Sequence, residues 1–83
     1  MSKYKAELKI LGRLYKSTGK TVEEAISNLK VSGGRGMAVL TVTKGKDSRW
    51  KVLNAVTTVR LFGQASPTLK AGAMKQILTR FEI

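Results

Sequence analysis

The chain has 83 residues, with 16 Lys and Arg against 5 Asp and Glu, and its formal charge is +11. This length suits one compact domain over residues 1–83 and leaves no room for a second module. An apolar content of 42% favours a folded core over a disordered chain. The sequence contains no Cys and no His, which excludes disulfides, thiol or imidazole catalysis, and zinc sites built on these residues.

Residues 3–15 alternate apolar and charged side chains, which predicts one long, half-buried strand. The charged positions of this segment are Lys3, Lys5, Glu7, Lys9 and Arg13. Leu11 and Gly12 interrupt the alternation, and we interpret them as a bulge or sharp twist within the strand. The charged positions are therefore expected on one face of a sheet.

A turn over residues 17–20 leads into a signal for the start of a helix. The Thr21 hydroxyl and the Glu24 carboxylate have the spacing of a capping box, which satisfies two free amides at a helix start. Apolar residues then recur at helical spacing. They predict an amphipathic helix that ends near Lys30 or Val31.

Two further strands are predicted over residues 37–44 and 49–53, where bulky and small or charged residues alternate. Residues 45–48 have the Gly, Asp and Ser content of a hairpin turn. Segment 54–62 carries two signals, and its many β-branched residues make a strand the preferred interpretation. A helical stripe also fits this region, through Val52, Val56, Val59 and Phe62.

Ser66 and Pro67 predict the start of a second helix, because a hydroxyl cap precedes a proline at the first helical position. Its apolar stripe is interrupted at Gly72, where the missing side chain is expected to allow close packing. The predicted class is α+β, an antiparallel sheet of three to four strands with two helices on one face, in the order βαββ(β)α. The other face of the sheet is left to solvent or to a partner.

Basic residues concentrate in the first predicted strand with its turn, and in the later hairpin. If helices cover one sheet face, the charged positions of residues 3–15 point to the other face. Four hairpin residues are expected on that open face if the register agrees: Thr41, Thr43, Arg49 and Lys51. The formal charge of +11 exceeds the magnitude of about 2 to 8 that solubility asks of a small domain, which favours polyanion binding. The candidate nucleic-acid-binding residues are Lys3, Lys5, Lys9, Arg13, Arg35, Lys44, Lys46, Arg49, Trp50 and Lys51.

Trp50 and Arg35 have competing interpretations, and Tyr15 has one conditional interpretation. Trp50 shares the parity of Val52, which favours packing in the core, and the alternative is stacking on a base between two basic neighbours. Arg35 lies in residues 33–36, which we interpret as a helix stop and flexible turn. The alternative is a loop whose amides approach a phosphate that Arg35 pairs. Tyr15 falls on the charged face if the phase of the first strand continues, as a second stacking ring.

The acidic residues do not form a recognisable catalytic constellation, because none is spaced to converge on a metal or a scissile bond. They are Glu7, Glu23, Glu24, Asp47 and Glu82. We therefore expect no enzyme activity, no metal and no cofactor. The start of the chain lacks the apolar run of an export signal, and the uncharged runs are too short for a membrane span. A cytoplasmic protein without membrane contact is expected.

The sequence therefore predicts a non-enzymatic nucleic-acid-binding domain. It would contact the phosphate backbone through a basic sheet face and hairpin, with little sequence preference. The alternative is a protein-interaction or assembly module, a small basic subunit that docks on an acidic protein or on a copy of itself.

Overall fold

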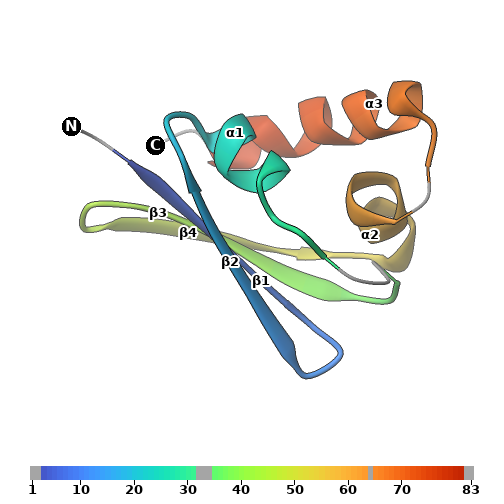
Figure 1. The fold of residues 1–83 in the computed structure, drawn as a ribbon, viewed down its shortest axis with the longest axis horizontal. Coiled ribbons are helices and arrows are strands. Elements are labelled where there is room, and N and C mark those ends of the chain that lie inside the picture. The colour runs from blue at the N-terminus through green and yellow to red at the C-terminus, as the bar shows by residue number, and fades with distance from the viewer. Residues whose placement is uncertain (1–2, 32–34, 64, 82–83) are drawn as a thin grey trace.

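A computed structural model describes residues 3–31, 35–63 and 65–81 of the chain (Figure 1). The strands are β1 (Tyr4–Ile10), β2 (Arg13–Gly19), β3 (Ala38–Lys44) and β4 (Asp47–Leu53). The helices are α1 (Val22–Ser27), α2 (Ala55–Phe62) and α3 (Pro67–Leu78), and a 3-10 turn, η1 (Thr79–Phe81), follows α3. The main elements therefore follow one another in the order ββαββαα.

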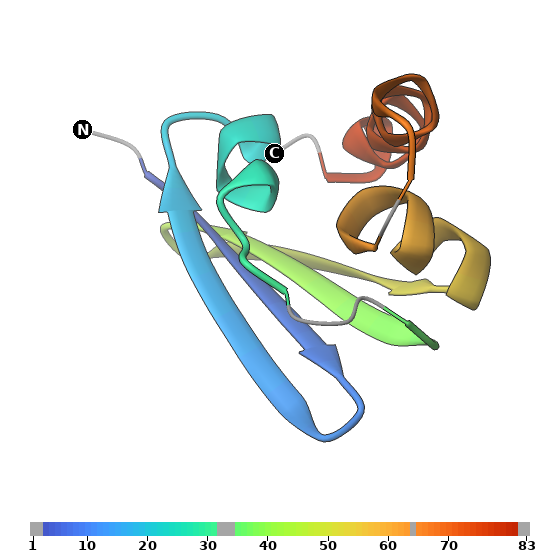
Figure 2. The same cartoon turned by 45° about the vertical axis from the view of Figure 1, so that its right-hand side comes forward.

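The strands form an antiparallel sheet in the order β2-β1-β3-β4, with β2 and β4 at the edges. Figures 1 and 2 both show α1, α2 and α3 lying over one face of this sheet, while the opposite face is open. The predicted α+β class, with an antiparallel sheet and helices on one face, is confirmed. None of the helices in the described ranges is long and apolar enough to cross a membrane.

The core lies between the sheet and the helices. Its sheet residues sit at alternate positions of β1 and β3 and at the end of β4, and they are Ala6, Leu8, Ile10, Ala38, Leu40, Val42 and Leu53. The helical layer contributes Ala25, Ile26, Leu61, Ala73, Met74, Ile77 and Phe81. Withdrawal of this apolar surface from water is the main force that holds the two layers together.

The prediction of one long strand over residues 3–15 is wrong, because the segment folds into a hairpin of β1 and β2. Leu11 and Gly12 have positive φ angles of 49° and 75°. Two consecutive residues of this kind are what a two-residue type I′ turn requires. Ile10 pairs with Arg13 across the turn. A reversal of the chain therefore takes the place of the expected bulge.

The α1 helix begins where the sequence predicts. Thr21 Oγ1 accepts a hydrogen bond from the Glu24 amide at 3.0 Å. The Glu24 carboxylate accepts a hydrogen bond from the Lys20 amide at 3.3 Å. The second bond of the capping box therefore comes from the residue before the cap, and not from Thr21 itself. The helix ends at Ser27 rather than near Lys30 or Val31.

Side-chain bonds and one close contact attach α1 to β2. The Ser17 hydroxyl donates to the Ala25 carbonyl, and Asn28 Nδ2 donates to the Thr18 carbonyl at 2.8 Å. The predicted turn over residues 17–20 is instead the end of β2, which runs to Gly19. A Cβ added at Gly19 would lie 2.8 Å from the Glu24 carbonyl carbon, so only glycine allows the helix backbone this close.

Segment 54–62 contains a helix, and the preferred strand interpretation is therefore wrong. Asn54 caps α2 through its side-chain oxygen, which accepts from the Thr57 amide at 2.8 Å. The fully buried Thr58 hydroxyl donates to the Asn54 carbonyl at 3.0 Å. Leu61 is buried in the core on the same side of the helix. This cap and this burial outweigh the strand preference of the β-branched residues.

The α3 helix confirms the predicted start, since Ser66 Oγ accepts from the Leu69 amide at 3.3 Å and Pro67 occupies the first helical position. The expected close packing at Gly72 is wrong. A Cβ built at Gly72 meets nothing within 4 Å, so this glycine faces open space.

Candidate nucleic-acid interface

The strand register places three cross-strand rows on the open face of the sheet, because directly paired residues share a face. The first row, nearest the β3–β4 turn, consists of Thr18, Lys5, Thr43 and Ser48. The second row consists of Lys16, Glu7, Thr41 and Trp50. The third row, nearest the β1–β2 turn, consists of Leu14, Lys9, Val39 and Val52.

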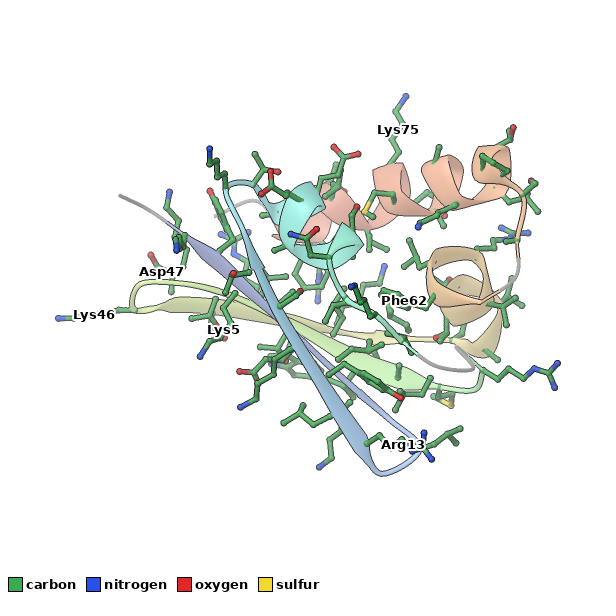
Figure 3. The ribbon with its side chains drawn as sticks, in the orientation of Figure 1. Lys5, Arg13, Lys46, Asp47, Phe62 and Lys75 are labelled. Atoms are coloured by element: carbon green, nitrogen blue, oxygen red, sulfur yellow. The ribbon has the colours of Figure 1, made fainter. Side chains whose placement is uncertain are left out.

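One end of the sheet gathers lysines, and we call it the basic end. Tyr4 pairs with both Gly19 and Lys44, so the start of β1, the end of β2 and the β3–β4 turn lie together. The lysines of the basic end are Lys3, Lys5, Lys20, Lys44 and Lys46. Figure 3 shows Lys5 on the side of the sheet away from the helices and Lys46 reaching outward from the β3–β4 turn, whereas Lys75 on α3 points away from the sheet.

The other end of the open face is mainly apolar, with Lys9 between Leu14 and Val39, and we call its third-row residues Leu14, Val39 and Val52 the apolar end. Their side chains are 53%, 37% and 45% exposed. Leu11, in the β1–β2 turn, and Met37, just before β3, are exposed nearby in the chain. The open face therefore changes from basic and hydroxyl-bearing to apolar along the strands.

Trp50 lies on the open face, and the preferred interpretation of core packing is wrong. It pairs with Thr41, and its side chain is 63% exposed. Trp50 and Val52 lie on the same side of β4, as predicted, but this side faces away from the core. Leu53 is the β4 residue that points inward. The stacking alternative thus has an accessible indole ring.

Arg49 and Lys51 lie on the helix-covered side of β4, and their predicted place on the open face is wrong. They pair with Val42 and Leu40, which are fully buried. Their charged ends still reach water, because β4 is an edge strand of the sheet. Thr41 and Thr43 have the predicted open-face position.

Arg13 and Tyr15 also lie on the covered side, contrary to the prediction for the charged face. Pairing of Ile10 with Arg13 puts the odd positions of β2 beside the even positions of β1. Arg13 is exposed at the start of the strand, and Tyr15 is half-buried against the core. Lys16, which was not among the candidates, takes the open-face place opposite Glu7. The signal that would have found it is the positive-φ turn.

The remaining candidates are spread over the two ends of the sheet. Lys44 Nζ lies 5.1 Å from the centroid of the Tyr4 ring, within cation–π range. Lys3 precedes Tyr4 in the chain and is exposed. Arg35 is also exposed, but it precedes β3 and so lies at the opposite end of this strand from Lys44. Residues 33 and 34 of the glycine loop proposed around Arg35 lie outside the described residues, and Gly36 has a φ of 91°.

A shallow hollow of about 450 Å³ lies where β4 meets η1, and we call it the edge hollow. Its lining residues are Ser48, Arg49, Trp50, Thr79 and Arg80. Sequence reasoning missed Thr79 and Arg80, because nothing local indicates that the last turn of the chain lies against β4. A second hollow of about 490 Å³, between α2 and α3, is lined mainly by apolar side chains.

The interface has the chemistry of a binding surface for anions. It presents ammonium and guanidinium groups together with hydroxyls and one exposed indole ring. Within the described ranges, no group of three or more acidic residues could hold a metal ion. Comparison of the chain with protein-family models, with curated proteins and with solved structures found no match.

Proposed function

We propose that this protein is a non-enzymatic nucleic-acid-binding domain that holds the phosphate backbone on the open face and at the basic end. The observation that carries this proposal is the placement of Lys5, Lys9 and Lys16 on the sheet face opposite to the helices. The lysines of the basic end continue this surface. Together they form an extended array of positive charge, and its binding to a polyanion is driven by the release of condensed counterions.

The other open-face residues support backbone contact. Hydroxyls at Thr18, Thr41 and Ser48 can donate to phosphate oxygens, and the Thr43 hydroxyl donates to the Ser48 hydroxyl at 3.4 Å. Glu7 is the acidic residue among the described open-face positions, and it lies opposite Lys16. Little sequence preference is expected, because phosphate contacts carry no base information. A cytoplasmic location stays part of the proposal, since a chain without cysteine is compatible with a reducing compartment.

The test is a fluorescence-anisotropy titration of labelled single-stranded and duplex DNA and RNA at about 50 and 200 mM salt. With about five phosphate contacts, log affinity for duplex DNA should fall with log salt at a slope near −4 to −5. This slope corresponds to a loss of roughly 500-fold across the salt range. A flat salt response, or no binding to any of the four nucleic acids at the lower salt, rejects the proposal.

A pair of double variants separates the effect of position from the effect of net charge. Lys5→Gln with Lys46→Gln removes charge at the basic end, and Lys70→Gln with Lys75→Gln removes the same charge from α3. The first variant should weaken binding and reduce the salt slope by about 2, since each lost phosphate contact reduces it by about 1. The second should leave the slope unchanged. Equal losses in both variants contradict the proposed surface.

A second candidate function is docking on an acidic protein or on a copy of this chain. The exposed apolar end favours it, because exposed apolar residues such as the neighbouring pair Val39 and Val52 often mark a protein contact. The edge strands β2 and β4 also offer unpaired backbone for strand addition. Light scattering after nuclease treatment and at high salt tests this candidate. Self-association that persists under both conditions supports it.

A further inference from the structure

The edge hollow combines two kinds of binding chemistry in one place. Arg49 and Arg80 supply guanidinium groups and Ser48 supplies a hydroxyl, all of which can donate hydrogen bonds to phosphate oxygens. The Thr79 hydroxyl, which also lines the hollow, donates to the Gln76 carbonyl at 3.3 Å. Trp50 supplies the flat face of an indole ring, on which a base can stack. A phosphate and a base are the two recognisable parts of one nucleotide.

The fold explains why these groups meet. Arg49 points to the covered side of β4, next to η1, and the following residue, Trp50, points to the open side. A ligand that wraps around the outer edge of β4 therefore reaches both side chains. Phe81 is fully buried and anchors η1 against the sheet, so core packing holds the neighbouring Thr79 and Arg80 in position.

We propose that the edge hollow binds one unpaired nucleotide of a single-stranded nucleic acid, with its phosphate between Arg49 and Arg80 and its base on Trp50. This inference rests on the proposed function, because the rest of the strand then crosses the open face along its lysines. The volume of about 450 Å³ lies in the range of small-ligand sites.

The exposed apolar residues of the open face explain the choice of a single strand. In a duplex, each base is stacked between its neighbours and presents only its edges in the grooves. Trp50 would then have no base face to stack on, and Val52, on the same face of β4, would meet phosphates. An unpaired strand presents apolar base faces, which cover such side chains while its phosphates meet the lysines.

Trp50 is the one tryptophan of the chain, so its fluorescence reports stacking directly. The full chain is titrated at low salt with an unlabelled oligothymidine of about 12 nucleotides, within the usual site sizes for single strands. A duplex of the same length serves as the comparison. We expect the single strand to quench the fluorescence and to bind more tightly than the duplex, and the duplex to leave the emission nearly unchanged.

Two variants of the edge hollow sharpen the test. Arg80→Gln should weaken single-strand binding about tenfold and reduce its salt slope by about 0.7, while duplex binding stays unchanged. Arg60→Gln, at an exposed position of α2 outside the edge hollow, is the matched control and should change neither. Trp50→Leu removes the fluorophore, so its affinity is measured by the anisotropy of a labelled oligothymidine. This variant should weaken single-strand binding about tenfold through lost stacking. Circular dichroism checks that each variant is folded.

The outcomes separate this inference from the proposed function. Equal binding of duplex and single strand without quenching overturns the inference and leaves the proposed function standing. Absence of binding to either nucleic acid rejects both. Quenching by polyglutamate that matches quenching by oligothymidine also overturns the inference, because the site then recognises acidic protein chains.

Discussion

The two faces of the sheet have opposite chemistry although the same strands build both. On the covered face, Leu8 and Leu40 are fully buried beneath the helices. On the open face, their chain neighbours Lys9 and Thr41 meet solvent. The difference arises because successive side chains of a strand point to opposite sides. The core and the proposed binding surface thus use alternate positions of one strand, so a substitution on one face can leave the other face intact.

Replacement of equal side chains on the two faces should give the largest contrast. Leu40→Ala leaves a cavity in the core and is expected to cost about 2–5 kcal/mol of unfolding free energy. Leu14→Ala removes the same atoms from a side chain that is 53% exposed, and is expected to cost less than about 0.5 kcal/mol. Urea denaturation followed by circular dichroism measures both. Similar costs would contradict the assignment of the faces.

The attachment of the helical layer to the covered face can be broken at Gly19. In Gly19→Ala the new Cβ collides with the backbone of α1, which is expected to cost about 1–3 kcal/mol. Gly72→Ala is the matched control, since its Cβ enters open space on α3 and should stabilise the protein by about 0.5–1 kcal/mol. If the melting temperatures of both variants rise, a Cβ at Gly19 does not collide with the backbone of α1.

The cap of α2 decides whether segment 54–62 joins the helical layer. Asn54→Ala removes the acceptor for the Thr57 amide and is expected to cost about 1 kcal/mol. Asn54→Asp keeps an acceptor at the same position and should retain nearly all of the stability. Chemical denaturation distinguishes them. Equal losses would mean that the side-chain acceptor does not stabilise the helix.

The smallest effect is expected at the boundary between the core and the basic end. Lys44→Gln removes the ammonium group above the Tyr4 ring and is expected to cost about 0.5 kcal/mol. Lys46→Gln, at the adjacent turn, removes the same charge without an aromatic partner in the described residues and should be neutral. Thermal denaturation at low and high salt measures both. Equal changes in melting temperature would show that the lost net charge, and not the contact with the Tyr4 ring, lowers the stability.

Local signals predicted much of the fold because they act within a few residues. The caps at Thr21 and Ser66 predicted the starts of α1 and α3, and alternation predicted β3. The sequence did not predict the chain reversal at Leu11, because leucine rarely adopts the left-handed conformation. The break in alternation at Leu11 and Gly12 was therefore interpreted as a bulge. The α2 segment was misread because its β-branched residues oppose its cap, and burial of Leu61 settles the conflict.

In the candidate site, too, local patterns predicted some positions, and strand pairing and packing decided the others. Alternation along the first strand predicted the open-face positions of Lys5 and Lys9. The hairpin register then replaced Arg13 with Lys16 on that face, and the pairing of Trp50 with Thr41 placed the indole there as well. Arg80 came to this region through the packing of the last turn, which no local pattern describes.

The sequence by itself determined an α+β domain with a strongly basic surface, because composition, periodicity and capping do not depend on distant segments. Only the tertiary structure decided which side of β2 and of β4 faces the helices. In these two strands apolar residues occur on both sides, so a period of two does not indicate which side is covered. That choice requires the strand pairings and the burial of the core, and here it separates Trp50 from Arg49 and brings Arg49 beside Arg80.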